Sequence, residues 1–435
     1  MSLSSPSRAA WSVTTVLAVI AAGALLPVAA GSASASEGLS PSGRVVCPQE
    51  SAVVGFPIAQ TTVIELAAGE SAASSISGTL PDGVQLHTGR NFLYGEPARV
   101  QSAAFTIEVS VTGPTGTTVE KANCTMAVKA SPSVTRVAGA DRYDQSVELS
   151  RANFTSSDTV YVASGEKYAD ALSAAAIAAQ HEAPLLLTPG ADIPEGVLSE
   201  IERLGAEQVV LVGGEASVSA RVVSRIESVR TGLTVTRIGG ADRYAVSRNL
   251  IAHPEFGARE SKRVYIATGA NFPDALTASP AAAAFDAPVL LVYGPEATLT
   301  AQEKATVSRL GAETVAIAGG ELSVSAALQH DLEKSYHTVR FGGRDRFEVG
   351  AALNADAFHE ADTVYLAAGA TYPDALTGGA VAGAAGVPLY ITQKDCLSGE
   401  AVYGIGRLAP SSVVILGGHS TLAPALDTLT WCALD

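Results

Sequence analysis

The sequence is short of positive charge. Its 435 residues include 28 Lys and Arg against 43 Asp and Glu, which gives a net charge of −15 at pH 7. A surface with this balance repels polyanions, so we expect no nucleic acid partner and no binding to an anionic membrane. Apolar residues make up 47% of the chain. That share is enough for packed cores, so the composition predicts a folded protein.

The sequence also lacks the usual signatures of bound metals and cofactors. It has four cysteines without a C-x-x-C pair, and its seven histidines are not clustered. We therefore expect no metal site. No G-x-G-x-x-G opens a strand–helix unit and no P-loop lysine motif occurs, so we expect no nucleotide or other cofactor.

Long apolar runs are absent after the first 30 residues. The run WSVTTVLAVIAAGALLPVAA at 11–30 follows Arg8, and small residues lead to Ala33-Ser34-Ala35, which has the spacing that signal peptidases accept. The pattern predicts a secretory signal at 1–35, and its removal would make the net charge one unit more negative. The alternative is a retained membrane anchor, which Pro27 and the cleavage motif disfavour.

The four cysteines agree with export to an oxidising compartment. Cys47 and Cys124 bracket one segment, and Cys396 and Cys432 both lie near the C-terminus. Three pairings are formally open, and two local disulfides, Cys47 with Cys124 and Cys396 with Cys432, are the natural one. Free buried thiols remain the alternative.

Residues 36–130 have the composition and residue pattern of an all-β module. Segments such as TTVIELAAG, NFLYGEP, AAFTIEVSVTG and CTMAVKA are short, rich in Val, Ile, Thr and Phe, and separated by Gly, Pro and Asp turns. This pattern predicts a small antiparallel sandwich. The stretch from ISGTLPDGVQLHTGRNFLYGEP to FTIEVSVT resembles the immunoglobulin-like, cadherin-like modules of bacterial surface proteins, which implies a spacer or adhesion unit. We find no His, Cys or carboxylate arrangement for hydrolysis in it.

After residue 130 the pattern changes to alternating strand and helix signals. Strand-like TVYVASG, PLLLT and QVVLVGG are nearly all apolar and are separated by helix-like segments of ten to fourteen residues. Such alternation predicts parallel α/β units whose sheets are covered on both faces. We expect three of them, at 131–233, 234–336 and 337–435, each a small three-layer domain.

The three units share landmarks in the same order at nearly the same intervals. Each opens with an Arg, a small-residue turn, an Asp-Arg pair and an aromatic, continues with an acid in a DAL segment, and later carries a Gly pair. The opening arginines are Arg136, Arg237 and Arg340; the Asp-Arg pairs are Asp141-Arg142, Asp242-Arg243 and Asp345-Arg346; the DAL acids are Asp170, Asp274 and Asp374; the Gly pairs are Gly213-Gly214, Gly319-Gly320 and Gly417-Gly418.

These motifs have structural explanations. The DAL acids enter the first turn of a helix, where a negative charge meets the positive end of the helix dipole. The Gly pairs allow a sharp turn after a buried strand, and the following hydroxyls, Ser217, Ser323 and Thr421, suit an N-cap. A fixed distance from the opening Arg to the next Asp suggests an ion pair within each unit. The alternative is ligand contact, because all these motifs follow strand ends, the edge where open α/β sheets place ligands.

On these motifs, residues 133–435 resemble three tandem repeats of the cell wall-binding repeat 2 family. The resemblance implies a pseudo-trimer of the three units in a secreted, non-covalently held surface protein of Gram-positive bacteria that grips an anionic wall polymer or peptidoglycan. Because one chain supplies all three units, we expect a monomer. The third unit departs from the pattern at Arg344, Phe347 and His419.

An acidic protein can hold an acidic polymer only through a local basic patch or bridging cations. We rank Arg142, Arg243 and Arg346 above Arg136, Arg237 and Arg340 as polymer contacts and expect no catalytic activity. Two other functions remain open: an adhesin whose sandwich binds a protein partner, and a wall hydrolase or its accessory.

Overall fold

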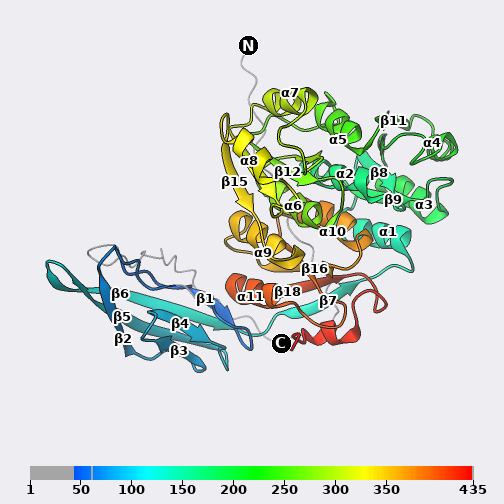
Figure 1. Ribbon diagram of the computed structural model, residues 1–435. Helices are drawn as coiled ribbons and strands as arrows, with labels where there is room; N and C mark the ends of the chain where they lie inside the picture. The colour runs from blue at the N-terminus through cyan, green and yellow to red at the C-terminus, as the bar shows by residue number, and fades with distance from the viewer. Residues whose placement is uncertain (1–43, 60–61, 434–435) are drawn as a thin grey trace, which may run out of the picture. The chain divides into compact units, whose positions relative to one another are not determined.

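A computed structural model describes residues 44–59 and 62–433 (Figure 1). The expected secretory signal at 1–35 lies outside the described residues. Within the described part, no helix has both the length and the apolar character needed to cross a bilayer.

The first module is all-β, as its residue pattern predicts. A four-stranded sheet has the order β1-β6-β5-β2, in which β5 pairs antiparallel with both β6 and β2, while β3 and β4 form a separate antiparallel pair. The disulfide between Cys47 and Cys124 joins the start of the module to β6. The strands are β1 (Ser51–Val53), β2 (Ser71–Gly78), β3 (Val84–His87), β4 (Phe92–Gly95), β5 (Gln101–Gly113) and β6 (Gly116–Lys129).

Three four-stranded parallel sheets follow, which we call the first, second and third sheets. Their strands are short and most of their residues are fully buried, which matches their nearly continuous apolar sequences. The strand orders are β11-β10-β8-β9, β13-β12-β14-β15 and β17-β16-β18-β7. The strands are β8 (Thr159–Ser164), β9 (Leu185–Thr188), β10 (Gln208–Val212), β11 (Thr234–Ile238), β12 (Arg263–Thr268), β13 (Val289–Val292), β14 (Thr314–Ala318), β15 (His337–Phe341), β16 (Thr363–Ala368), β17 (Leu389–Thr392), β18 (Ser412–Leu416) and β7 (Ser133–Val137).

The sheets are offset from the sequence repeats by one strand. The opening strand of the second repeat, β11, pairs with β10 of the first, and β15 pairs with β14 in the same way. The opening strand of the first repeat, β7, pairs with β18, so the first and last repeats together complete the third sheet. Our expectation that each sequence unit forms its own three-layer domain therefore needs correction. Local hydrophobic pattern cannot reveal which neighbour a strand joins.

Three Ala-rich helices connect the sheets. α2 (Tyr168–Gln180), α6 (Pro273–Ala284) and α10 (Pro373–Ala385) are almost wholly buried and all contact one another (Figure 1). Small side chains allow this close approach, and a β-carbon on Gly383 of α10 would stand 2.8 Å from the β-carbons of both Ala179 and Ala283. Each of these helices contacts strands of two sheets, so together they join the three sheets.

The remaining helices surround these three. Three of them, at 142–153, 243–252 and 346–357, also pack against the central helices, whereas the amphipathic ones at 195–204, 220–227 and 399–408 bury one face. The remaining helices are α1 (Arg142–Asn153), α3 (Glu195–Leu204), α4 (Ala220–Glu227), α5 (Arg243–Ala252), α7 (Ala301–Leu310), α8 (Ala326–Leu332), α9 (Arg346–Ala357), α11 (Gly399–Leu408) and the 3₁₀ helix η1 (Pro424–Thr428). A disulfide between Cys396 and Cys432 closes the C-terminal segment that carries η1, as expected.

Candidate functional site

The Asp of each opening motif caps a helix. The carboxylate of Asp141 accepts hydrogen bonds from the backbone N–H groups of Tyr143 and Asp144, at 2.8 and 3.0 Å. Asp242 and Asp345 cap α5 and α9 in the same way. These carboxylates are therefore engaged with their own helices and serve to begin them where the preceding strand ends.

The opening arginines hold the offset strands in place. Nη1 of Arg136, Arg237 and Arg340 donates to the carbonyl of Gly417, Gly213 and Gly319, at 2.7, 3.0 and 2.9 Å. Each bond joins an opening strand to the Gly turn of the adjoining strand. The expected ion pair within each unit is wrong, because the Asp of each motif is occupied as an N-cap and the Arg points toward the neighbouring turn.

The DAL acids lie against the Gly pairs. A β-carbon on Gly213, Gly319 or Gly417 would stand 2.6, 2.5 or 2.4 Å from the Oδ2 atom of the acid beside it, and each of these glycines has a left-handed φ. The acids paired in this order are Asp170, Asp274 and Asp374. Only glycine allows the turn to approach a buried carboxyl so closely.

Burial raises the pKa of all three DAL acids. The pKa of Asp374 reaches about 6, because burial disfavours its charged form more than the Thr421 hydrogen bond and the Arg142 charge favour it. Ser217 and Ser323 bond Asp170 and Asp274 in the same way. The N-cap role expected for these three hydroxyls is therefore wrong. Ser219 and Ser325, two residues later, occupy the cap positions of α4 and α8, and Ala423 that of η1.

The second arginine of each motif donates a hydrogen bond to the turn just before the DAL segment of its own repeat. It also contacts the aromatic residue of the corresponding turn in another repeat. Nη1 of Arg142 donates to the Gly165 carbonyl at 2.7 Å and to the Tyr372 hydroxyl at 3.3 Å. Nη1 of Arg243 donates to the Gly269 carbonyl at 2.6 Å and to the Tyr168 hydroxyl at 3.0 Å. Arg346 bonds the Gly369 carbonyl at 2.5 Å and lies over the Phe272 ring.

An acid, a hydroxyl and an arginine thus recur at the carboxyl edge of each sheet, and we call these groups the first, second and third sites. Because the strands are offset, every site draws on two sequence repeats, and the third site joins the last repeat to the first. The first site comprises Asp170, Ser217 and Arg243; the second comprises Asp274, Ser323 and Arg346; the third comprises Asp374, Thr421 and Arg142.

Three aromatic residues meet where the sites approach one another. The ring centroids of Tyr168, Phe272 and Tyr372 are 5.5 to 5.7 Å apart in every pairing. Sequence reasoning missed this cluster, although a signal was present: an aromatic stands two residues before the DAL acid in all three units. Each ring also carries an arginine over its face.

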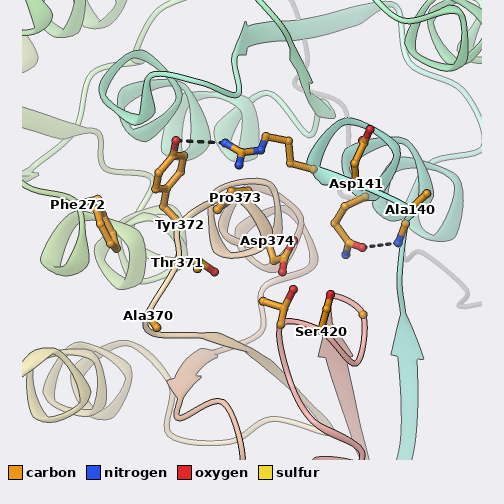
Figure 2. A pocket seen from close by; sticks show the side chains of 14 residues that line it. Ala140, Asp141, Phe272, Ala370, Thr371, Tyr372, Pro373, Asp374 and Ser420 are labelled. Atoms are coloured by element: carbon orange, nitrogen blue, oxygen red, sulfur yellow. Dashed lines mark hydrogen bonds between the residues drawn. The ribbon is translucent and has the colours of Figure 1, made fainter.

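A pocket of about 450 Å³ opens at the third site. Its walls are the turn after β7, the turn after β16 and the loop after β18, with Phe272 contributed by the second unit. Figure 2 shows Asp374 pointing from α10 toward the loop that carries Ser420, with Tyr372 and Phe272 on the other side. Gln145 also lines the pocket and was not singled out from the sequence. Its side chain bonds the Gly139 N–H and the Val137 carbonyl.

Within residues 44–59 and 62–433, no three His, Cys, Asp or Glu side chains lie close enough together to hold a metal ion. The three sites themselves present guanidinium, carboxyl, hydroxyl and aromatic groups.

The family model for cell wall binding domain 2 (CWB2) matches residues 136–223, 237–329 and 340–426. The chain belongs to the CWB2 family. The three matches begin at Arg136, Arg237 and Arg340, so the family's sequence period is the one that the opening motifs mark. Membership of this family identifies a cell-wall-associated protein.

Curated relatives resemble the CWB2 part of the chain. The N-acetylmuramoyl-L-alanine amidase LytC of Bacillus subtilis is 28% identical over 299 residues, which cover 69% of this chain and 57% of LytC. The amidase enhancer of Bacillus subtilis is 27% identical over 292 residues, covering 67% of this chain and 39% of the enhancer. The chain thus spans about half or less of the length of these relatives.

Two solved structures share the fold. Cwp6 from Clostridium difficile superposes with a TM-score of 0.63 at 22% identity, over 88% of this chain and 67% of Cwp6. Cwp8 from the same organism superposes with a TM-score of 0.60 at 20% identity, over 82% of this chain and 62% of Cwp8. These likenesses support the CWB2 fold.

Proposed function

We propose that this chain is a secreted surface protein of a Gram-positive bacterium, anchored non-covalently through its three CWB2 repeats to an anionic secondary polymer of the cell wall. The observation that carries the proposal is the threefold recurrence of an arginine, an acid and a hydroxyl at the carboxyl edges of the three sheets. Three linked sites suit a repeating polymer, because each bound site raises the effective concentration of polymer at the next.

The two sets of arginines differ in how far the protein itself uses them. In Arg136, Arg237 and Arg340, two or more guanidinium nitrogens donate hydrogen bonds to turns or side chains of the protein. Among the described residues, Arg142, Arg243 and Arg346 donate hydrogen bonds through Nη1 alone. Their Nε and Nη2 groups are thus available to an anion, and we assign these three as the polymer contacts.

These arginines explain how a protein with a negative net charge can bind a negatively charged polymer. The protein as a whole is acidic, but a guanidinium presents a planar fork of donors that fits a phosphate or carboxylate. Desolvation within a pocket strengthens that interaction relative to an exposed surface. The acidic remainder of the surface would then limit non-specific adhesion to the wall.

The N-terminal β module is, in this proposal, an immunoglobulin-like sandwich displayed by the anchored chain. It would act as a spacer or meet a protein partner, which would make the molecule an adhesin. We propose no enzymatic role. The alignments with the amidase and the amidase enhancer cover the repeats, and a wall hydrolase accessory is the weaker alternative.

A sedimentation assay with isolated Bacillus subtilis walls tests the proposal. The purified mature chain is mixed with intact walls and with walls stripped of anionic polymer, each with and without a divalent chelator. We expect retention on intact walls only, insensitive to the chelator, and a loss of retention in the folded triple variant Arg142→Gln, Arg243→Gln, Arg346→Gln. Equal retention on stripped walls would assign peptidoglycan as the ligand, and loss with chelator would assign bridging cations.

A further inference from the structure

The turns that follow β8, β12 and β16 are not held equally. The Tyr168 hydroxyl donates to the Ala270 carbonyl of the next turn at 2.9 Å, and the Tyr372 hydroxyl donates to the Glu166 carbonyl at 3.2 Å. Phe272, at the equivalent position, has no hydroxyl to offer the turn at Ala370. The turn beside the third site is therefore the one that lacks this bond, and Phe272 and Ala370 both line the pocket there.

A second difference lies at the entrance of each site. At the first site, Nζ of Lys167 donates to the Ala216 carbonyl at 2.7 Å, so its side chain spans the gap between the turn after β8 and the loop after β10. The residue before it, Glu166, accepts from the Gly190 N–H at 2.9 Å. Asn271 and Thr371 stand in place of Lys167 at the second and third sites, and Ala270 and Ala370 stand in place of Glu166, so neither site has side chains long enough for this bridge.

We infer that the three sites do not contribute equally, and that the third site, built from the last and first repeats, binds a unit of the wall polymer most tightly. This inference rests on the proposed function and concerns where on the CWB2 array the ligand enters. The third site is the one that lacks both contacts: Phe272 stands where Tyr168 and Tyr372 bond the other two turns, and Thr371 stands where Lys167 bridges the first site.

The groups around the pocket specify the kind of unit it takes. Nε and Nη2 of Arg142 suit a phosphate or carboxylate, and the side chains of Asp374, Ser420 and Thr421 suit hydroxyl groups. Tyr372 and Phe272 add aromatic carbon atoms to the lining, and this apolar surface suits the apolar part of a sugar ring. The pocket therefore fits one sugar or polyol unit that bears a negative charge, and its volume, about 450 Å³, accommodates a unit of that size.

The test introduces at the third site the lysine that bridges the entrance of the first site. In Thr371→Lys, the new side chain occupies the position of Lys167 and can reach the Ser420 carbonyl, the counterpart of Ala216. The matched control, Asn271→Lys, places the same residue at the entrance of the second site. Both positions are exposed, so we expect both variants to fold and melt as the wild type does.

Binding is measured by calorimetry with poly(glycerol phosphate) and by sedimentation with isolated walls. We expect Thr371→Lys to weaken binding about tenfold or more and Asn271→Lys to change it less than about twofold. Equal losses in the two variants, or no loss in Thr371→Lys, would overturn the inference while leaving wall anchoring intact. If the wild type itself binds neither probe, the proposed function fails instead.

A second variant makes a smaller change, so that the test does not depend on the folding of Thr371→Lys. Phe272→Tyr adds only one hydroxyl, placed to donate to the Ala370 carbonyl, and should slow hydrogen exchange in the turn at 369–372 while weakening binding in the same direction. Unchanged exchange and unchanged affinity in Phe272→Tyr would argue against the inference, whatever Thr371→Lys does.

Discussion

Arg136 binds Asp427, although 291 residues separate them in the chain. The guanidinium Nη2 and the carboxylate Oδ1 are 2.6 Å apart, and Nε of Arg136 donates to the same oxygen at 3.0 Å. Arg136 is only 13% exposed and also bonds the Gly417 carbonyl. This contact fixes the first strand of the first repeat to the last helical turn of the third.

Removing that contact should weaken the third sheet. We expect Arg136→Ala to cost about 2 kcal/mol of unfolding free energy, because it leaves the Gly417 carbonyl without its side-chain donor and the Asp427 carboxylate with His419 as its remaining side-chain partner. Asp427→Asn should cost about 1 kcal/mol, because the carboxylate is partly exposed and its pairing is screened by solvent. Urea unfolding followed by circular dichroism measures both, and a larger loss for Asp427→Asn than for Arg136→Ala would contradict this ranking.

The Gly417-Gly418 pair offers a sharp comparison of neighbouring substitutions. A β-carbon at Gly417 would stand 2.4 Å from the Asp374 carboxylate on a backbone with φ of +108°, whereas a β-carbon at Gly418 would meet nothing within 4 Å. We expect Gly417→Ala to destabilise the protein by roughly 2 to 4 kcal/mol and Gly418→Ala to change stability by less than about 0.5 kcal/mol. Thermal melts of both variants check this, and equal effects would show that the Gly417 turn can relax.

Stability should fall as the pH rises through the titration of Asp374. Its pKa is raised to about 6 in the folded chain from 3.8, so the folded state holds a proton that the unfolded state has lost. The stabilising contribution of the neutral form is complete below about pH 4 and is lost by about pH 6. The difference in unfolding free energy between wild type and Asp374→Asn should therefore decrease by about 1 to 3 kcal/mol between pH 4 and pH 7.

A difference for Asp374→Asn that stays level across this range would contradict the prediction, and would mean that the Asp374 carboxyl titrates near its ordinary pKa in the folded chain.

Much of this molecule could be predicted from local patterns in the sequence. The apolar runs that became β8, β9 and β10 are too short and too continuous for surface helices, and the regular spacing of DAL and Gly-Gly revealed the period. The position of Pro273 and Pro373 at the first turn of α6 and α10 also follows from local chemistry, since proline lacks the N–H that a helix start leaves unused. The pairing of cysteines followed from their positions at opposite ends of the chain.

The pairing of the opening strands could not be read in the same way. β7, β11 and β15 have closely similar sequences, and a strand carries no local mark of whether its partner lies before or after it in the chain. The same uncertainty hid the partners of Arg136 and Ser217. Arg136 was assigned to the nearest acid in sequence, and Ser217 to the nearest helix, whereas each binds a group that only the tertiary fold brings close.

The completion of the third sheet by β7 sets the order in which the molecule can be assembled. The first and second sheets contain only strands contiguous in sequence, so each can form as soon as its own segment is free. β7 is made before any of them, yet its partner β18 is the last strand of the described residues. Its edge must therefore stay open until β18 has been made, and the third sheet is completed only when the first and last repeats meet.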